Sequence, residues 1–65
     1  MNSETEKLIR EVEEIKELEL QAETFYGTLA QQISDAGDRA IIEGIAKDER
    51  KHAQMAESII RTLKS

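Results

Sequence analysis

Two stretches decide the fold of this chain: residues 8–33, LIREVEEIKELELQAETFYGTLAQQI, and residues 42–63, IEGIAKDERKHAQMAESIIRTL. In both, apolar residues recur at alternating steps of four and three, which is the spacing of the buried stripe of a helix that packs against other helices. Polar side chains interrupt this stripe near the middle of each stretch. The stripe positions are Leu8, Val12, Ile15, Glu19, Ala22, Tyr26, Leu29 and Ile33, then Ile42, Ile45, Glu49, His52, Ala56, Ile59 and Leu63.

The composition favours an all-α fold. The 65 residues include no Pro and three Gly, and 35% of them are charged, which is typical of helical chains. The absence of Cys excludes disulfides, zinc–thiolate sites and iron–sulfur clusters. Folds this small usually depend on disulfides, metals or oligomerisation. Metal binding and oligomerisation are therefore the two sources of stability that we expect.

The charge and the apolar content bear on partners and location. The net charge of −5 argues against nucleic acid, which needs a positive surface. No apolar run approaches the ~20 residues that cross a bilayer, and the first six residues lack the basic start and apolar core of a signal peptide. We expect no nucleic-acid partner, no membrane segment and a cytoplasmic location.

The turn-forming residues divide the chain into one helical hairpin spanning residues 1–65. We predict a first helix over about residues 4–33, a turn over 34–37 and a second helix over 38–63. Ser3 and Glu6 fit a capping box at the first helix, and Ser34 or Asp35 is the expected N-cap of the second. The short connection makes the helices antiparallel neighbours. One hairpin leaves half of each apolar stripe in water, so we expect two copies to pair as a homodimeric four-helix bundle, alone or within a higher, even-numbered assembly.

Three polar residues in the stripe predict a cation site. Glu49 and His52 are three residues apart and therefore share a helix face. In an antiparallel hairpin, Glu19 lies roughly level with them. A buried carboxylate without a partner is costly. A two-fold dimer would gather four carboxylates and two imidazoles, which is the ligand set of a di-metal site in a helical bundle.

The motifs ELQAETFY over residues 19–26 and IAKDERKH over residues 45–52 resemble the ferritin-like superfamily. The resemblance covers roughly residues 8–63 and is close to the first two helices of bacterioferritins and rubrerythrins. The single-hairpin format is most similar to the encapsulated ferritins, which are half-length members whose metal site forms when two chains pair. It implies a di-iron protein that oxidises Fe²⁺ with O₂ or peroxide and serves iron storage, with an encapsulin shell and its nanocompartment as a partner and location.

The resemblance also implies roles for individual residues. Glu19 matches a terminal metal ligand, Glu49 the carboxylate that bridges two metals, and His52 the nitrogen ligand, so that these three would be the catalytic residues. Asp48 matches an acid that hydrogen-bonds the histidine of the opposite half-site, and Tyr26 matches a tyrosine just outside the ligands.

Several alternatives stay open at the level of sequence. Manganese or zinc also suits carboxylate and imidazole ligands. The chain could be a non-catalytic metal-stabilised assembly or iron-binding module, or a metal-free coiled coil in which the polar residues set the register. Tyr26 is either a packed aromatic residue that hydrogen-bonds Glu49 or a redox participant. Phe25 and Met55, beside the stripe, are expected in the core. Arg50 stands where bacterioferritins carry a haem-ligating Met, so haem is not expected.

Overall fold

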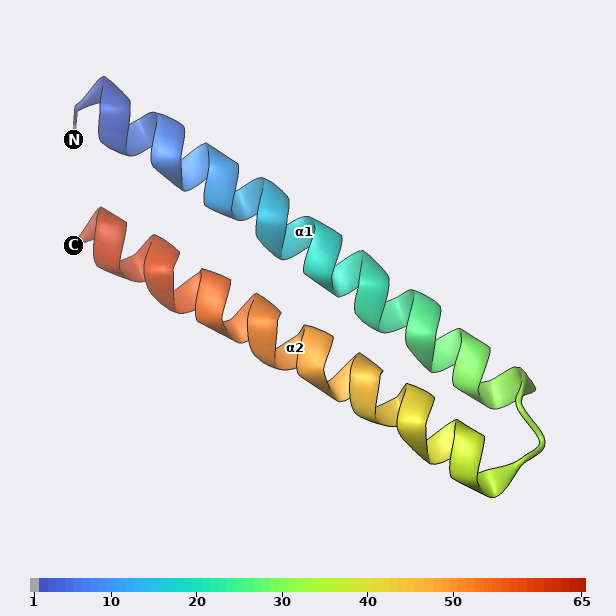
Figure 1. The fold of residues 1–65 in the computed structure, drawn as a ribbon. Coiled ribbons are helices and arrows are strands. Elements are labelled where there is room, and N and C mark those ends of the chain that lie inside the picture. Colours follow the sequence, from blue (N-terminus) through green and yellow to red (C-terminus); the bar gives the residue numbers. More distant parts are fainter. Residues whose placement is uncertain (1) are drawn as a thin grey trace.

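Helix α1 runs from Ser3 to Gln32 and helix α2 from Ala36 to Lys64 in the computed structural model, which describes residues 2–65. The helices lie antiparallel, with both chain ends at one end of the hairpin and the short connection at the other (Figure 1). The Cα trace measures 51 × 14 × 10 Å. Residues 2–65 contain no strand. The predicted all-α antiparallel hairpin is confirmed.

The N-terminus of α1 differs from the predicted capping box. Asn2, not Ser3, is the N-cap, and its side-chain oxygen accepts a hydrogen bond from the backbone N–H of Thr5 at 2.8 Å. Ser3 is already helical. Asn and Ser are about equally good N-caps, so the local sequence does not discriminate between the two positions. Glu4 and Glu6 still lie in the first turn, where they favour the positive end of the helix dipole.

The connection is tightened by side chains from both sides. Asp35 caps α2 by accepting a hydrogen bond from the backbone N–H of Asp38 at 2.8 Å. Arg39 donates from Nε and a terminal guanidinium nitrogen to the carbonyl of Ile33, at 3.0 and 2.8 Å. The last turn of α1 has no basic residue of its own. Arg39 therefore supplies the positive charge that the end of α1 needs.

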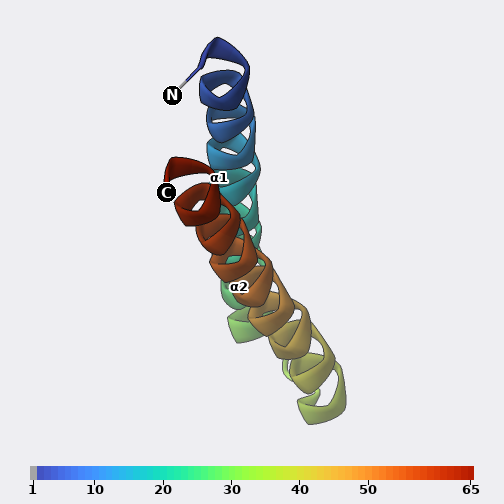
Figure 2. The ribbon, with the colours of Figure 1, turned by 90° about the vertical axis from the view of Figure 1, so that its left-hand side faces the viewer.

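The core is a narrow line of contact between the helices, and α2 crosses from one side of α1 to the other along its length (Figure 2). Isoleucine fills it near the free ends of the hairpin and alanine fills much of the rest. Small side chains allow two helices to approach closely, so few atoms are needed to exclude water. Within residues 2–65, the buried core residues are Ile9, Ala30, Ala53, Ala56 and Ile60.

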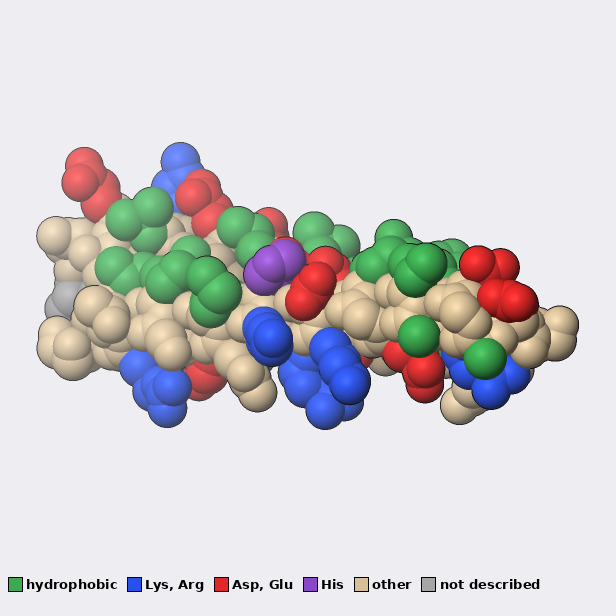
Figure 3. Space-filling model, turned by 60° about the horizontal axis from the view of Figure 1, so that its bottom comes forward, with side chains coloured by type: hydrophobic (Ala, Val, Ile, Leu, Met, Phe, Trp, Pro, Cys, Tyr) green, Lys and Arg blue, Asp and Glu red, His purple; other side chains and the backbone are tan. Residues whose placement is uncertain are grey.

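A large part of the apolar surface stays outside this core. Leu8, Ile15 and Ile59 belong to the predicted stripe, yet each is about half exposed because a single neighbouring helix covers only one side of the stripe. Phe25 and Met55 were expected in the core, and this was wrong for the hairpin, where they are 62% and 61% exposed. Figure 3 shows such a face, with green hydrophobic side chains on both sides of the purple histidine. We call this surface the apolar face; it comprises Leu8, Ile15, Leu18, Phe25, Ile41, Met55 and Ile59.

Neither α1 nor α2, the two helices in residues 2–65, combines the length and the apolar character that crossing a membrane requires.

Candidate metal centre

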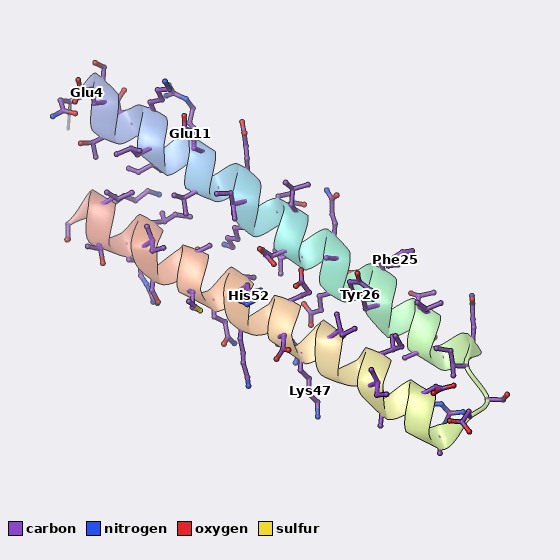
Figure 4. The ribbon with its side chains drawn as sticks, viewed as in Figure 1. Glu4, Glu11, Phe25, Tyr26, Lys47 and His52 are labelled. Carbon is purple, nitrogen blue, oxygen red and sulfur yellow. The ribbon has the colours of Figure 1, made fainter. Side chains whose placement is uncertain are left out.

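Three potential metal ligands converge at mid-length of the hairpin. Glu19 comes from α1, and Glu49 and His52 come from successive turns of α2. Each side chain offers one ligand atom, and these atoms lie within 4.8 Å of one another. Figure 4 shows His52 near the middle of α2, on the side that faces α1. The predicted convergence of these three residues is thus present in the fold, and we call them the Glu–Glu–His cluster.

One imidazole nitrogen approaches both carboxylates at nearly equal distances. Nδ1 of His52 is 3.4 Å from Oε2 of Glu19 and 3.5 Å from Oε1 of Glu49. Two donor atoms that each lie about 2.1 Å from one ion at a tetrahedral angle are about 3.4 Å apart. The spacing of both nitrogen–oxygen pairs is therefore close to what a shared ion needs. Carboxylate oxygen and imidazole nitrogen suit iron, manganese and zinc.

The cluster is only partly buried. The side chains of Glu19 and Glu49 are 24% and 21% exposed, whereas the His52 side chain is 51% exposed. The stripe in the sequence predicted a buried imidazole, and the hairpin alone does not provide one. His52 lies at the edge of the interhelical contact, next to the apolar face. The cluster is consequently open on one side, and three protein ligands leave further coordination positions free.

The electrostatics of the cluster favour an added positive charge. A hydrogen bond with the Glu19 carboxyl group raises the pKa of Glu49 above its ordinary value, and desolvation and repulsion by Glu19 act in the same direction. His52 opposes this shift. Two carboxylates this close cannot both ionise without a cost. A bound cation would remove that cost, because it stabilises both ionised groups.

The two residues expected just outside the ligands have different surroundings. Asp48 is exposed on α2, one turn before His52. Tyr26 is half-buried, and its ring packs edge-on against Phe25 with centroids 5.3 Å apart. Figure 4 places Tyr26 on α1, nearer the connection than His52. Within residues 2–65, neither the carboxylate of Asp48 nor the hydroxyl of Tyr26 forms a hydrogen bond with the cluster, so an Asp48–histidine contact would have to come from a second copy.

Two ion pairs between the helices were missed by the sequence analysis. Lys16 Nζ lies 2.7 Å from Glu57 Oε2, and Arg50 Nε lies 2.5 Å from Glu23 Oε2. The Lys16 ammonium group lowers the pKa of Glu57, mainly through its hydrogen bond. The signal that could have found them is the position of these charges beside the apolar stripe, where charged residues often pair between neighbouring helices.

No protein-family model, curated protein or solved structure matches this chain. The ferritin-like resemblance therefore stays a prediction that rests on the residues of the cluster and their spacing.

Proposed function

We propose that this protein is a metal-binding homodimer in which two hairpins pair through the apolar face. The observation that supports this proposal is the position of the Glu–Glu–His cluster. It lies partly exposed at mid-length, beside large apolar side chains that remain in water in a single hairpin. Monomeric proteins rarely expose extended apolar patches that have no function. A second copy on this face would cover both the apolar side chains and His52.

A two-fold axis beside the cluster would double its ligands. The dimer would then hold four carboxylates and two imidazoles around one centre, which is sufficient for two metal ions. Glu49 would be the bridging carboxylate, and Glu19 and His52 would complete each half. The exposed Asp48 would hydrogen-bond the partner's His52 and so fix the orientation of that ring. Divalent ions would offset the repulsion between the carboxylates, which couples metal binding to pairing.

We further propose that the metal is iron and that the reaction is oxidation of Fe²⁺. Two Fe²⁺ ions supply the two electrons that reduce O₂ to hydrogen peroxide, or hydrogen peroxide to water, with two protons taken up in either case. Anionic carboxylates favour Fe³⁺ over Fe²⁺, because the higher charge interacts more strongly with them. Glu19, Glu49 and His52 would bind and orient the two substrate ions. Tyr26, half-buried on α1 two turns from Glu19 towards the connection, would limit access of water from that side.

Iron titration followed by rapid oxidation tests this function. The protein is first titrated with Fe²⁺ without oxygen, and we expect two ions per dimer. It is then mixed with O₂ or hydrogen peroxide in a stopped-flow instrument while Fe³⁺ absorbance is recorded. We expect a rate well above that of buffer, and loss of this rate in Glu49→Ala. A rate equal to the buffer blank would contradict the oxidase proposal.

A second candidate function is a metal-stabilised assembly without catalysis. The cluster of an isolated hairpin favours a cation irrespective of any redox reaction, because the carboxylates of Glu19 and Glu49 repel each other. In this case zinc or manganese would bind with the same stoichiometry and stabilise the dimer as well as iron does. Binding of two ions per dimer with no oxidation above the blank would select this candidate.

A further inference from the structure

A second surface of the hairpin carries two ion pairs between the helices, one on each side of a small apolar centre. The acid lies on α2 in one pair and on α1 in the other. This surface lines a groove of about 380 Å³ between the helices. Leu20 is two residues from Leu18, and Glu57 is two residues from Ile59, so each lies about 160° around its helix from a member of the apolar face. We call this surface the charged groove; it comprises Lys16, Leu20, Glu23, Arg50, Ala53, Gln54 and Glu57.

The polarity of the two ion pairs alternates along the groove. At one level α1 carries Lys16 and α2 carries Glu57. Two turns nearer the connection, α1 carries the acid, Glu23, and α2 carries the base, Arg50. The pairs are seven residues apart on both helices, which is about 10 Å along the axis.

The apolar centre lies midway between the pairs. Leu20, on α1, is 36% exposed, and Ala53 and Gln54 lie across from it on α2. Two copies can stack groove to groove about a two-fold axis that runs across the groove at the level of this centre, at right angles to the helices. This axis exchanges the two levels. It brings Lys16 over the partner's Glu23, and Glu57 over the partner's Arg50. Every charge would then face a charge of opposite sign, with the two Leu20 side chains in contact at the axis.

We propose that the charged groove is a self-association surface for a second copy of this chain, with α1 packed antiparallel to the partner's α1 around Leu20. This arrangement requires the alternation, whereas one with the two-fold axis along the helices does not. With a two-fold axis along the helices, any two ion pairs between α1 and α2 would be complementary, whatever their order. With a perpendicular axis, only opposite order at the two levels avoids contacts between like charges.

The strength of this association should be modest. An exposed ion pair alone contributes little to stability, but networks of several charges contribute more. The four charges of each groove would join those of the partner into such a network, with Leu20 removed from water. The surface shares no residue with the Glu–Glu–His cluster or the apolar face, so it does not require metal. It would link metal-bound dimers into larger even-numbered assemblies that dissociate in high salt.

Cysteine capture combined with charge swaps tests this surface separately from the proposed function. The chain has no Cys, so Leu20→Cys reports contact at the charged groove and Leu18→Cys reports contact at the apolar face. Both variants are oxidised in the presence of EDTA, and the rate of disulfide-linked dimer formation is measured. We expect Leu20→Cys to cross-link, and to do so at least tenfold more slowly in 1 M NaCl, with little effect of salt on Leu18→Cys.

The swap Lys16→Glu with Glu57→Lys keeps the ion pair within each hairpin but places a carboxylate over the partner's Glu23. We expect it to slow cross-linking of Leu20→Cys at least tenfold and to leave Leu18→Cys unchanged. Adding Glu23→Arg and Arg50→Glu restores the alternation and should restore the rate. Circular dichroism verifies that each variant remains helical.

Equal rates of Leu20→Cys cross-linking in the three backgrounds, or failure of the four-residue variant to restore the rate, would overturn the proposal. So would the absence of cross-linking in Leu20→Cys itself. None of these results depends on metal binding. A failure of the proposed function would appear instead as a lack of metal binding and, when Mn²⁺ replaces EDTA, as a lack of cross-linking at Leu18→Cys.

Discussion

The Glu–Glu–His cluster and the charged groove both place acidic side chains at mid-length of the same two helices, but their charges are balanced differently. In the charged groove, each carboxylate has a permanently charged Lys or Arg within ion-pair distance. In the cluster, two carboxylates share one histidine, and the pKa of Glu49 is raised. The groove balances its acids within one chain, whereas the cluster has two carboxylates and one histidine, a balance that an added cation would complete.

The sharpest test of this difference is removal of one acid from each region. Glu49→Gln should weaken binding of Mn²⁺ or Zn²⁺ by about 100-fold or more, because it removes a ligand and not merely a group that orients one. Glu57→Gln is the matched control from the charged groove and should change the affinity less than about threefold. Isothermal titration calorimetry measures both. Similar losses in the two variants would mean that metal binds through general acidity and not at the cluster.

Metal should stabilise the fold through the cluster alone. At a free metal concentration of 100 times Kd, binding to the folded state adds about 2.7 kcal/mol, which for a domain of this size raises Tm by roughly 10 °C or more. His52→Ala should abolish this increase, whereas Lys16→Met should keep it. Thermal unfolding followed by circular dichroism, with metal and with EDTA, provides the measurement. An unchanged Tm in the unmodified protein would argue against metal-coupled folding.

The apolar face should matter for pairing and much less for the hairpin itself. Phe25 is 62% exposed in one chain, so Phe25→Ser should leave the helices intact. Burial of a Phe side chain contributes about 1.5–3 kcal/mol, and the variant should therefore weaken the dimer at least about tenfold. Sedimentation equilibrium measures the change, with Thr24→Ser as a control on the same helix. A dimer of undiminished affinity would exclude this face as the interface.

The smallest expected effect is an opposite pH dependence in the two regions when metal is absent. The raised pKa of Glu49 means that the folded state holds this proton more tightly than the unfolded chain does. Its contribution to stability is present at low pH and is lost as the pH rises through the raised pKa. Glu57, with its lowered pKa, contributes above its ordinary pKa, and this contribution is lost as the pH falls through the lowered value.

Urea unfolding in EDTA, from about pH 3 to about pH 7, separates the two contributions. Glu49→Gln should remove part of the loss of stability that accompanies rising pH, and Glu57→Gln should remove part of the loss at acidic pH. If both substitutions shifted the profile in the same direction, the two regions would not differ in charge balance as we describe.

Much of the cluster could be predicted from the sequence because helix geometry is local. A spacing of three residues puts Glu49 and His52 on one face of any helix, and a short connection sets the level of Glu19 against them. The exposure of His52 could not be predicted in this way. It depends on which side of the apolar stripe the second helix covers, and the stripe is wider than one helix.

The exact helix ends and the ion pairs between the helices could not be predicted from the local sequence either. Asn2 and Ser3 are both good N-caps, so the first residue of α1 was decided by the backbone and not by residue type. The contact of Arg39 with the Ile33 carbonyl depends on how the chain turns between the helices. The pairs Lys16–Glu57 and Arg50–Glu23 depend on the rotation of each helix about its own axis.

The sequence by itself determined the helices, the antiparallel hairpin and the choice of the three candidate ligand residues. The apolar period, the turn residues and the residue spacing act over a few residues, so their effect does not depend on tertiary contacts. Only the tertiary structure decided which half of the apolar stripe is buried and that His52 stays half exposed. It also decided that the two ion pairs of the charged groove have opposite order on the two helices. These features follow from the relative rotation of two packed helices, which depends on the sum of many weak contacts and on no single motif.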